Sequence, residues 1–300
     1  MDEKNVRNRA FLGRGDYVRT DLACEGGAPC AEETRETVDV GSEPITVTRR
    51  READGGRTVT VACGRITARG EGELGELAEL LSRELTAMGE SMASCKVGKE
   101  LRVLVVGLGN RDMTPDAIGP GTVSRLTVTR HLREYDEAMF CGLGCCELSA
   151  LAPGVKGQTG LESGELVKAA VDMTHPHLLV AVDALAARSC DRLASTVQLS
   201  DRGISPGAGI GNHRMPLNRE SMGCPVLGLG VPTVVDSSTL VWDALREAGM
   251  EEGEIPLGLS RVLEEGRSFI VSPRDCDRMV ELTCRLLAMS LNRAFGVGEI

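Results

Sequence analysis

Two aspartates follow short apolar runs at places where a folded chain could bring them together. Residues 103–106 form a β-branched run, and Asp116 comes soon after it, behind a glycine turn. Residues 178–182 form a second run, which Asp183 follows directly. The carboxyl ends of parallel strands meet at one edge of a sheet, where open α/β sheets place their sites. Two adjacent carboxyl groups cannot both ionise easily, so such a pair can share a proton and catalyse attack of water on an amide.

The residues around Asp116 indicate how it would be held. The glycines within residues 107–109 permit a sharp turn, and Thr114 followed by Pro115 is typical of a helix cap and first turn. Asp116 would then lie near the positive end of the helix dipole. The alternative is a structural role for each aspartate, as a helix cap or as the partner of an arginine such as Arg188. The spacing alone leaves both interpretations open.

Other kinds of site have weaker support. Residues 107–112 lack the third glycine of a dinucleotide fingerprint, because position 112 is an aspartate, and no helix signal follows the glycine loop at 203–212. That loop is expected to lie beside the site. No Cys-x-x-Cys pair occurs among the eleven cysteines, which are expected to be reduced thiols in the core. We therefore expect no cofactor and no resident metal. One metal site stays open, in which the two aspartates are joined by His131, His175, His177 or His213.

The composition is that of an ordinary globular protein. The 300 residues are 42% hydrophobic and carry a net charge of -10, so one large domain with its own core is possible. The acidic balance argues against direct nucleic-acid binding, and no apolar run approaches the roughly 20 residues of a membrane span. The first residues are charged and lack the apolar segment of a secretory signal. A cytoplasmic protein is expected.

Strand and helix signals alternate along the chain. Residues 44–69 alternate apolar and polar positions around a Gly-Gly turn, which predicts a hairpin, and residues 73–93 place leucines at helical spacing. Further strands are expected at 103–106, 178–182, 196–200 and 225–229, with helices between them and a last helix from about residue 273 to 294. This pattern predicts a single α/β domain with a mostly parallel central sheet flanked by helices, and a small N-terminal hairpin region.

The remaining segments carry less regular patterns. Residues 1–35 are polar and rich in glycine and arginine, which indicates an extended arm outside the core. One helix is expected to run from Thr114 towards His131. Residues 138–160 are rich in glycine and cysteine, and within them residues 152–157 are expected to form a long loop.

Seven segments of the chain together carry a family resemblance. They are 18–25 (VRTDLACE), 105–110 (VVGLGN), 114–120 (TPDAIGP), 128–132 (VTRHL), 152–155 (APGV), 181–188 (AVDALAAR) and 230–236 (GVPTVVD). In this order they resemble the germination proteases, the spore proteases of endospore-forming bacteria. The stretch 101–120 alone also resembles the hydrogenase-maturation endopeptidases, in which residues at the positions of Asp116 and Asp183 help to bind nickel.

The resemblance implies a function and a mode of action. It implies an endopeptidase that begins to degrade the small acid-soluble spore proteins when a spore germinates. It also implies an inactive precursor that cleaves itself, and a homotetramer in the cytoplasm of the spore core. Asp116 and Asp183 would form an aspartic-type catalytic pair without a cofactor, in a fold like that of the hydrogenase-maturation proteases.

The resemblance also gives residues 21–25 a meaning. Family substrates are cut after an acidic residue and before a large apolar residue, which is followed by alanine and, two positions later, by glutamate. The sequence DLACE has that pattern, so self-cleavage is expected between Asp21 and Leu22. Residues 1–21 would be the propeptide and 22–300 the peptidase domain, which includes the 44–69 hairpin region. The alternative is an arm with a chance match.

Two other hypotheses remain open on the sequence alone. One is a metal-dependent maturation endopeptidase of the hydrogenase-maturation type. The other is a non-enzymatic module that binds an anionic ligand through its glycine loops. Between Leu245 and Ser272 this chain is shorter than the better-known germination proteases, which bears on substrate range and oligomeric state.

Overall fold

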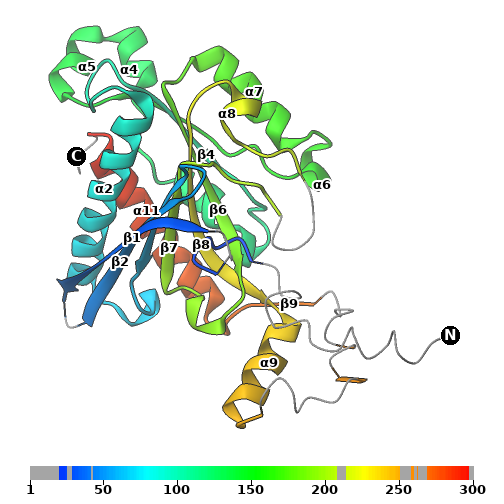
Figure 1. The fold of residues 1–300 in the computed structure, drawn as a ribbon. Coiled ribbons are helices and arrows are strands. Elements are labelled where there is room, and N and C mark those ends of the chain that lie inside the picture. The colour runs from blue at the N-terminus through cyan, green and yellow to red at the C-terminus, as the bar shows by residue number, and fades with distance from the viewer. Residues whose placement is uncertain are drawn as a thin grey trace.

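A nine-stranded mixed sheet runs through the molecule and carries helices on its faces (Figure 1). The computed structural model describes residues 20–25, 29–41, 43–207, 214–250, 258–259, 262 and 269–296. In chain order the elements are β1 (Cys30–Val40), β2 (Glu43–Glu52), β3 (Arg57–Ala62), η2 (Ile66–Ala68), α2 (Glu71–Ala93), β4 (Arg102–Gly107), η3 (Thr114–Asp116), α3 (Ile118–Val123), α4 (Arg130–Tyr135), α5 (Glu137–Leu143), β5 (Glu147–Leu151), α6 (Lys156–Thr159), α7 (Ser163–Thr174), β6 (Leu178–Ala187), η4 (Cys190–Arg192), β7 (Thr196–Ser200), α8 (Arg219–Met222), β8 (Val226–Asp236), α9 (Ser237–Glu247), β9 (Ile270–Val271) and α11 (Cys276–Ala294).

The sheet has a parallel centre and an antiparallel flank. Its strand order is β1-β2-β3-β7-β8-β6-β4-β5, and β9 pairs with β8. The strands β8, β6, β4 and β5 run parallel to one another, whereas β1, β2, β3 and β7 pair in antiparallel fashion. The predicted hairpin is therefore the β2–β3 pair, and it belongs to the same sheet as the rest of the domain. The predicted single α/β domain is confirmed.

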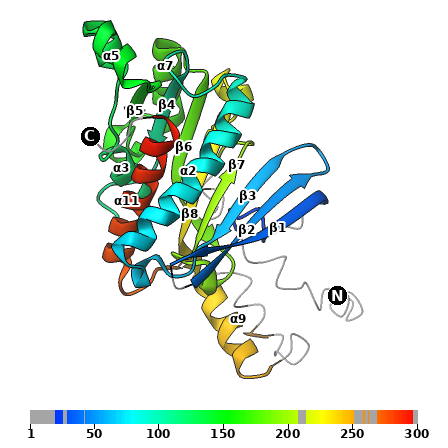
Figure 2. The same cartoon turned by 90° about the vertical axis from the view of Figure 1, so that its left-hand side faces the viewer.

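Alternate residues of the central strands build two apolar layers, because successive side chains of a strand point to opposite faces. One layer lies under α2 and α11 and contains the strand residues Val103, Val105, Val180 and Val182. The other lies under α7 and α8 and contains Leu104, Val106, Leu179 and Ala181. Figure 2 shows α2 and α11 side by side on one face. The parallel centre is thus covered on both faces, as its near-continuous apolar strands require.

The helix α2 follows the predicted leucine spacing and has defined ends. The N–H of Gly70 donates to Glu73 Oε2 at 2.9 Å, and acidic residues in the first turn suit the helix dipole. Ser94 ends the helix in the left-handed conformation, with φ 51°. The buried leucines of this helix pack against α11 and the sheet. Among the described residues, no helix is both long and apolar enough to cross a membrane.

One expectation about the middle of the chain was wrong, and a second was right only in part. The helix expected from Thr114 to His131 is broken, since Thr127 N donates to Asn292 Oδ1 and the Thr129 main chain donates to Leu148. These tertiary bonds replace helical ones, and α4 begins only at Arg130. The expected loop at 152–157 is shorter than predicted, because residues 152–155 have no regular structure and α6 begins at Lys156. The glycine- and cysteine-rich region before it contains α5 and also β5, which pairs in parallel with β4.

The expected arm at residues 1–35 is also partly wrong. Residues 30–40 form the edge strand β1, which is mostly exposed. Leu22 is 1% exposed and packs in a cluster with Leu185, Ala187 and Val235. The described segment 20–25 is therefore part of the folded domain. Residues 1–19 of the expected propeptide lie outside the described residues.

We expect Leu85→Ala to lower the free energy of unfolding by about 3 kcal/mol, because Leu85 is fully buried between α2 and the sheet. Urea unfolding followed by circular dichroism measures this loss. The matched change on the same helix is Gly75→Ala, whose added Cβ meets no atom within 4 Å. It should stabilise by up to about 1 kcal/mol. Equal effects of the two changes would contradict this packing.

Candidate functional site

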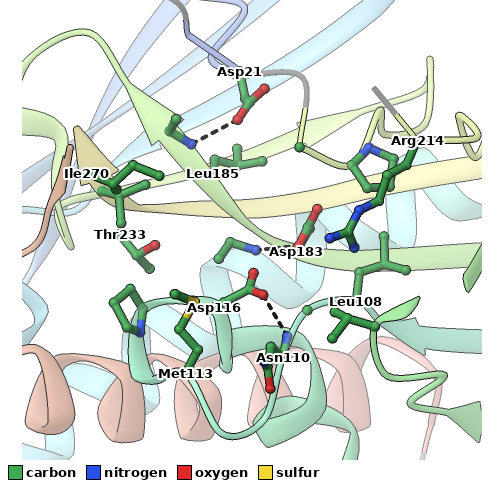
Figure 3. A pocket seen from close by; sticks show the side chains of 18 of the residues that line it. Asp21, Leu108, Asn110, Met113, Asp116, Asp183, Leu185, Arg214, Thr233 and Ile270 are labelled. Carbon is green, nitrogen blue, oxygen red and sulfur yellow. Dashed lines mark hydrogen bonds between the residues drawn. The ribbon is translucent and has the colours of Figure 1, made fainter. Parts of the chain in front are cut away.

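A cavity of about 320 Å³ opens where β4 ends and beside the second half of β6. Its lining includes Asp116, Asp183, Asp21 and Arg214 (Figure 3). In that view Asp183 lies between Asp21 and Asp116, and the guanidinium group of Arg214 points towards it. The two aspartates singled out in the sequence thus line one cavity, and the residue before the expected cleavage point lines it too.

Glycines bring Asp116 to this cavity. Gly109 has φ +112°, a conformation that side chains rarely adopt, and a Cβ there would collide with the main chain of Asp116. The N–H of Asn110 donates to Asp116 Oδ2 at 2.7 Å and fixes the carboxylate. The expected Thr114 cap is wrong, because η3 begins after Met113 and has no side-chain cap. The turn geometry holds Asp116 without it.

Asp183 lies within a strand and not at its end. The prediction that the strand stops at 182 is wrong, because β8 pairs with β6 as far as Ala187 and keeps it extended. The neighbour on the other side, β4, stops earlier, at the Gly107–Val182 pair. Asp183 is 6% exposed, and its Oδ1 accepts a hydrogen bond from Ala184 N at 2.9 Å. The carboxyl group is therefore buried inside the sheet, next to the space that β4 leaves.

The two carboxyl groups have altered proton affinities. Burial raises the pKa of Asp183 well above its ordinary value, and the nearby charges of Asp116 and Asp21 raise it further. Burial also raises the pKa of Asp116, while the Asn110 hydrogen bond opposes this rise. Arg214 lowers the pKa of both groups. The more deeply buried Asp183 is thus the better holder of a proton, and Asp116 is the better base.

The segment 20–25 reaches the same cavity. Asp21 N donates to the carbonyl oxygen of Ala186 at 3.0 Å, and Ala186 N donates to Asp21 Oδ2 at 2.9 Å. Leu22 then turns into its apolar cluster. The bond between Asp21 and Leu22 therefore joins a residue of the cavity lining to a residue of the core.

The histidines considered as metal ligands lie elsewhere or outside the described residues. His131 is exposed on α4, and His175 and His177 lie before the start of β6, at the opposite end of the strand from the cavity. His177 Nδ1 accepts a hydrogen bond from Arg102 N at 3.1 Å. His213 and residues 208–212 of the glycine loop are not among the described residues. Within the described ranges, no three His, Cys, Asp or Glu side chains are grouped to hold a metal ion.

The cysteines are all free thiols, and several lie in the core. Burial raises the pKa of the Cys63 and Cys146 thiols to about 12, so both stay protonated at neutral pH. None of the cysteines lines the cavity that contains the aspartates. The predicted core placement therefore holds for the buried cysteines, but it is wrong for Cys30 and Cys141, which are exposed.

Some residues of the site were missed in the sequence. Arg214 follows the glycine loop in an Asn-His-Arg sequence, and only its charge close to that loop could have drawn attention to it. Asn110 acts through its main-chain N–H, which no side-chain pattern could reveal. Gln198 lies in β7 and bonds to the segment 20–25, far from it in the chain.

Comparisons with known proteins point to one family. A sequence profile of the germination protease family matches residues 27–248. The germination protease of Clostridium perfringens is 36% identical over 315 residues, which cover 92% of this chain and 94% of that protein. The one from Caldanaerobacter subterraneus subsp. tengcongensis is 36% identical, covering 94% and 95%. The one from Bacillus subtilis (strain 168) is 32% identical, covering 86% and 82%.

The chain is also similar to a solved structure of another protein. It is a nickel–iron hydrogenase maturation protease from Thermococcus kodakarensis, 18% identical, and the match covers 62% of this chain and 92% of that chain with a TM-score of 0.28. That score is too low to support an argument about fold or activity. The profile and the full-length relatives are sufficient by themselves: this chain belongs to the germination protease family.

Proposed function

We propose that this chain is a self-processing endopeptidase that begins the degradation of small acid-soluble spore proteins during germination, with Asp116 and Asp183 as its catalytic pair. The observation that carries the proposal is the cavity that both carboxyl groups line, in a chain of the germination protease family. The raised pKa of Asp183, caused by burial and by Asp116, supports a shared proton in that cavity.

The pair can divide the work of amide hydrolysis. Ionised Asp116 removes a proton from water as the water oxygen bonds to the carbonyl carbon, and protonated Asp183 gives its proton to the carbonyl oxygen. The tetrahedral intermediate then returns a proton to Asp183, Asp116 protonates the leaving nitrogen, and the C–N bond breaks. Both carboxyl groups end in their starting states. Burial keeps Asp183 protonated at a pH where an exposed aspartate would be ionised.

The first substrate bond in this proposal belongs to the chain itself. Cleavage between Asp21 and Leu22 would release residues 1–21 and leave 22–300 as the mature enzyme. Asp21 lines the cavity with the catalytic pair, which supports this position. We further propose a homotetramer in the spore core, with the spore proteins as protein substrates.

We expect Asp116→Asn and Asp183→Asn each to lower the rate of peptide-bond cleavage by at least about a hundredfold, because an amide can neither remove nor supply the proton. Mass spectrometry of the full chain should show a product beginning at Leu22 for the wild type and for neither of these two variants. Cleavage of a small acid-soluble spore protein gives the second readout. The control is Asp172→Asn on the exposed surface of α7, which should behave as the wild type. Full activity of either cavity variant would reject the pair.

The free energy of unfolding should depend on pH because the Asp183 carboxyl group is buried. The folded chain holds the Asp183 proton more tightly than the unfolded chain, whose pKa is about 3.9. As the pH rises above that value the unfolded chain ionises first, so the wild type loses up to about 1.4 kcal/mol per pH unit until the folded pKa is passed. Asp183→Asn removes this loss, so its stability relative to the wild type should increase from pH 4.5 to pH 7. Urea unfolding at both values tests this; an unchanged difference would contradict it.

Removal of metal should leave the activity of this pair intact. Dialysis of the processed enzyme against a strong chelator, with elemental analysis of the product, is expected to change the cleavage rate less than about twofold, because both proton transfers use side chains. A rate that falls with the metal content and returns on adding one divalent metal would instead favour the metal-dependent alternative.

A further inference from the structure

The strand β6 has an open edge beside the catalytic cavity. Its neighbour β4 makes its last pair between Gly107 and Val182, while β6 continues to Ala187. Backbone groups of alternate strand residues point to the same side. The N–H groups of Ala184, Ala186 and Arg188 therefore point to the same edge of β6 as that of Val182, where β4 no longer pairs with the strand.

A carboxylate accepts a hydrogen bond from each of these three N–H groups. Ala184 N donates to Asp183 Oδ1 at 2.9 Å, Ala186 N to Asp21 Oδ2 at 2.9 Å, and Arg188 N to Glu25 Oε2 at 2.7 Å. Two of the acceptors belong to the segment 20–25. Asp21 N also donates to the Ala186 carbonyl, so the segment adds to the edge as an extra strand would. The open edge thus holds acidic side chains at the first and fifth positions of residues 21–25.

Gln198 holds the main chain of the same segment. It is 7% exposed on β7, and its Nε2 donates to the carbonyl oxygen of Asp21 at 3.2 Å. Its Oε1 accepts from Ala23 N at 2.7 Å. The first bond is made to the carbonyl group of the Asp21–Leu22 peptide bond itself, and the second to the N–H of the next peptide bond. One side-chain amide therefore holds the main chain at the expected cleavage point, and both of its hydrogen bonds are to backbone groups.

The side chain of Leu22, which lies between the two backbone groups that Gln198 binds, is buried in an apolar cluster. Leu22 packs against Leu185, Ala187 and Val235. A second cavity, of about 370 Å³, is lined by Gln198 and shares Asp21 and Asp183 with the catalytic cavity. An extended chain that Gln198 holds therefore passes the buried carboxyl group.

We propose that the open edge of β6 and Gln198 form the peptide-recognition site of this enzyme. The pattern itself is the one that the family resemblance implies, and the inference assigns the elements that bind it. The open edge binds the acidic residues at the first and fifth positions, the apolar cluster binds the large second residue, and Gln198 binds the main-chain N–H of the third. The chain's own residues 21–25 occupy it first, and protein substrates with the same pattern occupy it in trans. Gln198 contacts the carbonyl oxygen of the bond that the catalytic pair cleaves and thereby orients that bond. This inference rests on the proposed function.

The test uses two peptides with the sequence of residues 18–27, in which serine replaces Cys24. The second peptide carries N-methylalanine in place of Ala23 and so lacks the N–H that donates a hydrogen bond to Gln198 Oε1. The ratio of kcat/KM for the two peptides is measured with the full chain after self-processing, with Gln198→Leu and with Thr196→Val. Thr196 is buried two positions earlier on β7, and no bond to the segment involves it. Because both peptides are measured on one enzyme, competition from the enzyme's own segment lowers both kcat/KM values by the same factor and leaves their ratio unchanged.

The wild type and Thr196→Val should favour the unmethylated peptide about tenfold, and Gln198→Leu should treat the two peptides alike. A general loss of structure in Gln198→Leu would lower both rates and leave the ratio unchanged. The same ratio in wild type and Gln198→Leu would therefore overturn the inference while the protease function stands.

Failure of the proposed function gives a different result. If the wild type cleaves neither peptide, fluorescence anisotropy with labelled peptides supplies the same ratio for binding. An affinity ratio of about tenfold that Gln198→Leu abolishes would keep the recognition site and reject the protease function. Absence of binding of the unmethylated peptide to the wild type would overturn the recognition site as well.

Discussion

The rest of this structure depends on keeping a carboxyl group buried in the middle of a sheet. Asp183 lies in β6, with one neighbouring strand continuing past it and the other ending before it. Removing an ionised carboxylate from water is costly, so burial favours its neutral form, and the charge of Asp116 adds to that preference. The site therefore lowers the stability of the fold. The two apolar layers on β4 and β6 supply the stability that offsets this cost.

The partner carboxyl group reaches the cavity through a close contact between glycines. A Cβ on Gly107 would collide with the main chain of Gly119, and a Cβ on Gly119 would collide with Leu108. Since both positions lack a side chain, α3 lies directly against the end of β4. That contact places η3, which precedes α3, over the strand end and brings Asp116 to the cavity. A backbone approach this close explains why the turn is rich in glycine although it binds no phosphate in the proposed reaction.

Long, regular patterns made most of the architecture predictable. The leucine spacing of α2, the alternation of β2 and β3, and the apolar runs of β4 and β6 each agree with the structure. Asp116 and Asp183 could be paired because each follows such a run. The burial of Leu22 could not be predicted, since a single leucine in a polar stretch has no periodicity. Distant contacts with Leu185 and Val235 bury it.

Unequal strand lengths explain what periodicity could not. The apolar run 178–182 marks only the part of β6 that pairs with a strand along each of its two edges, β4 on one and β8 on the other. Pairing with β8 alone extends the strand beyond residue 182. Because β4 stops at Gly107, the extension has space beside it and backbone groups without a β4 partner. The space is the cavity that Asp183 lines, and the backbone groups hold Asp21 and Glu25. The early end of β4 therefore places the proposed catalytic carboxyl group next to the proposed docking edge for a peptide, as cleavage of a chosen bond in a protein substrate requires.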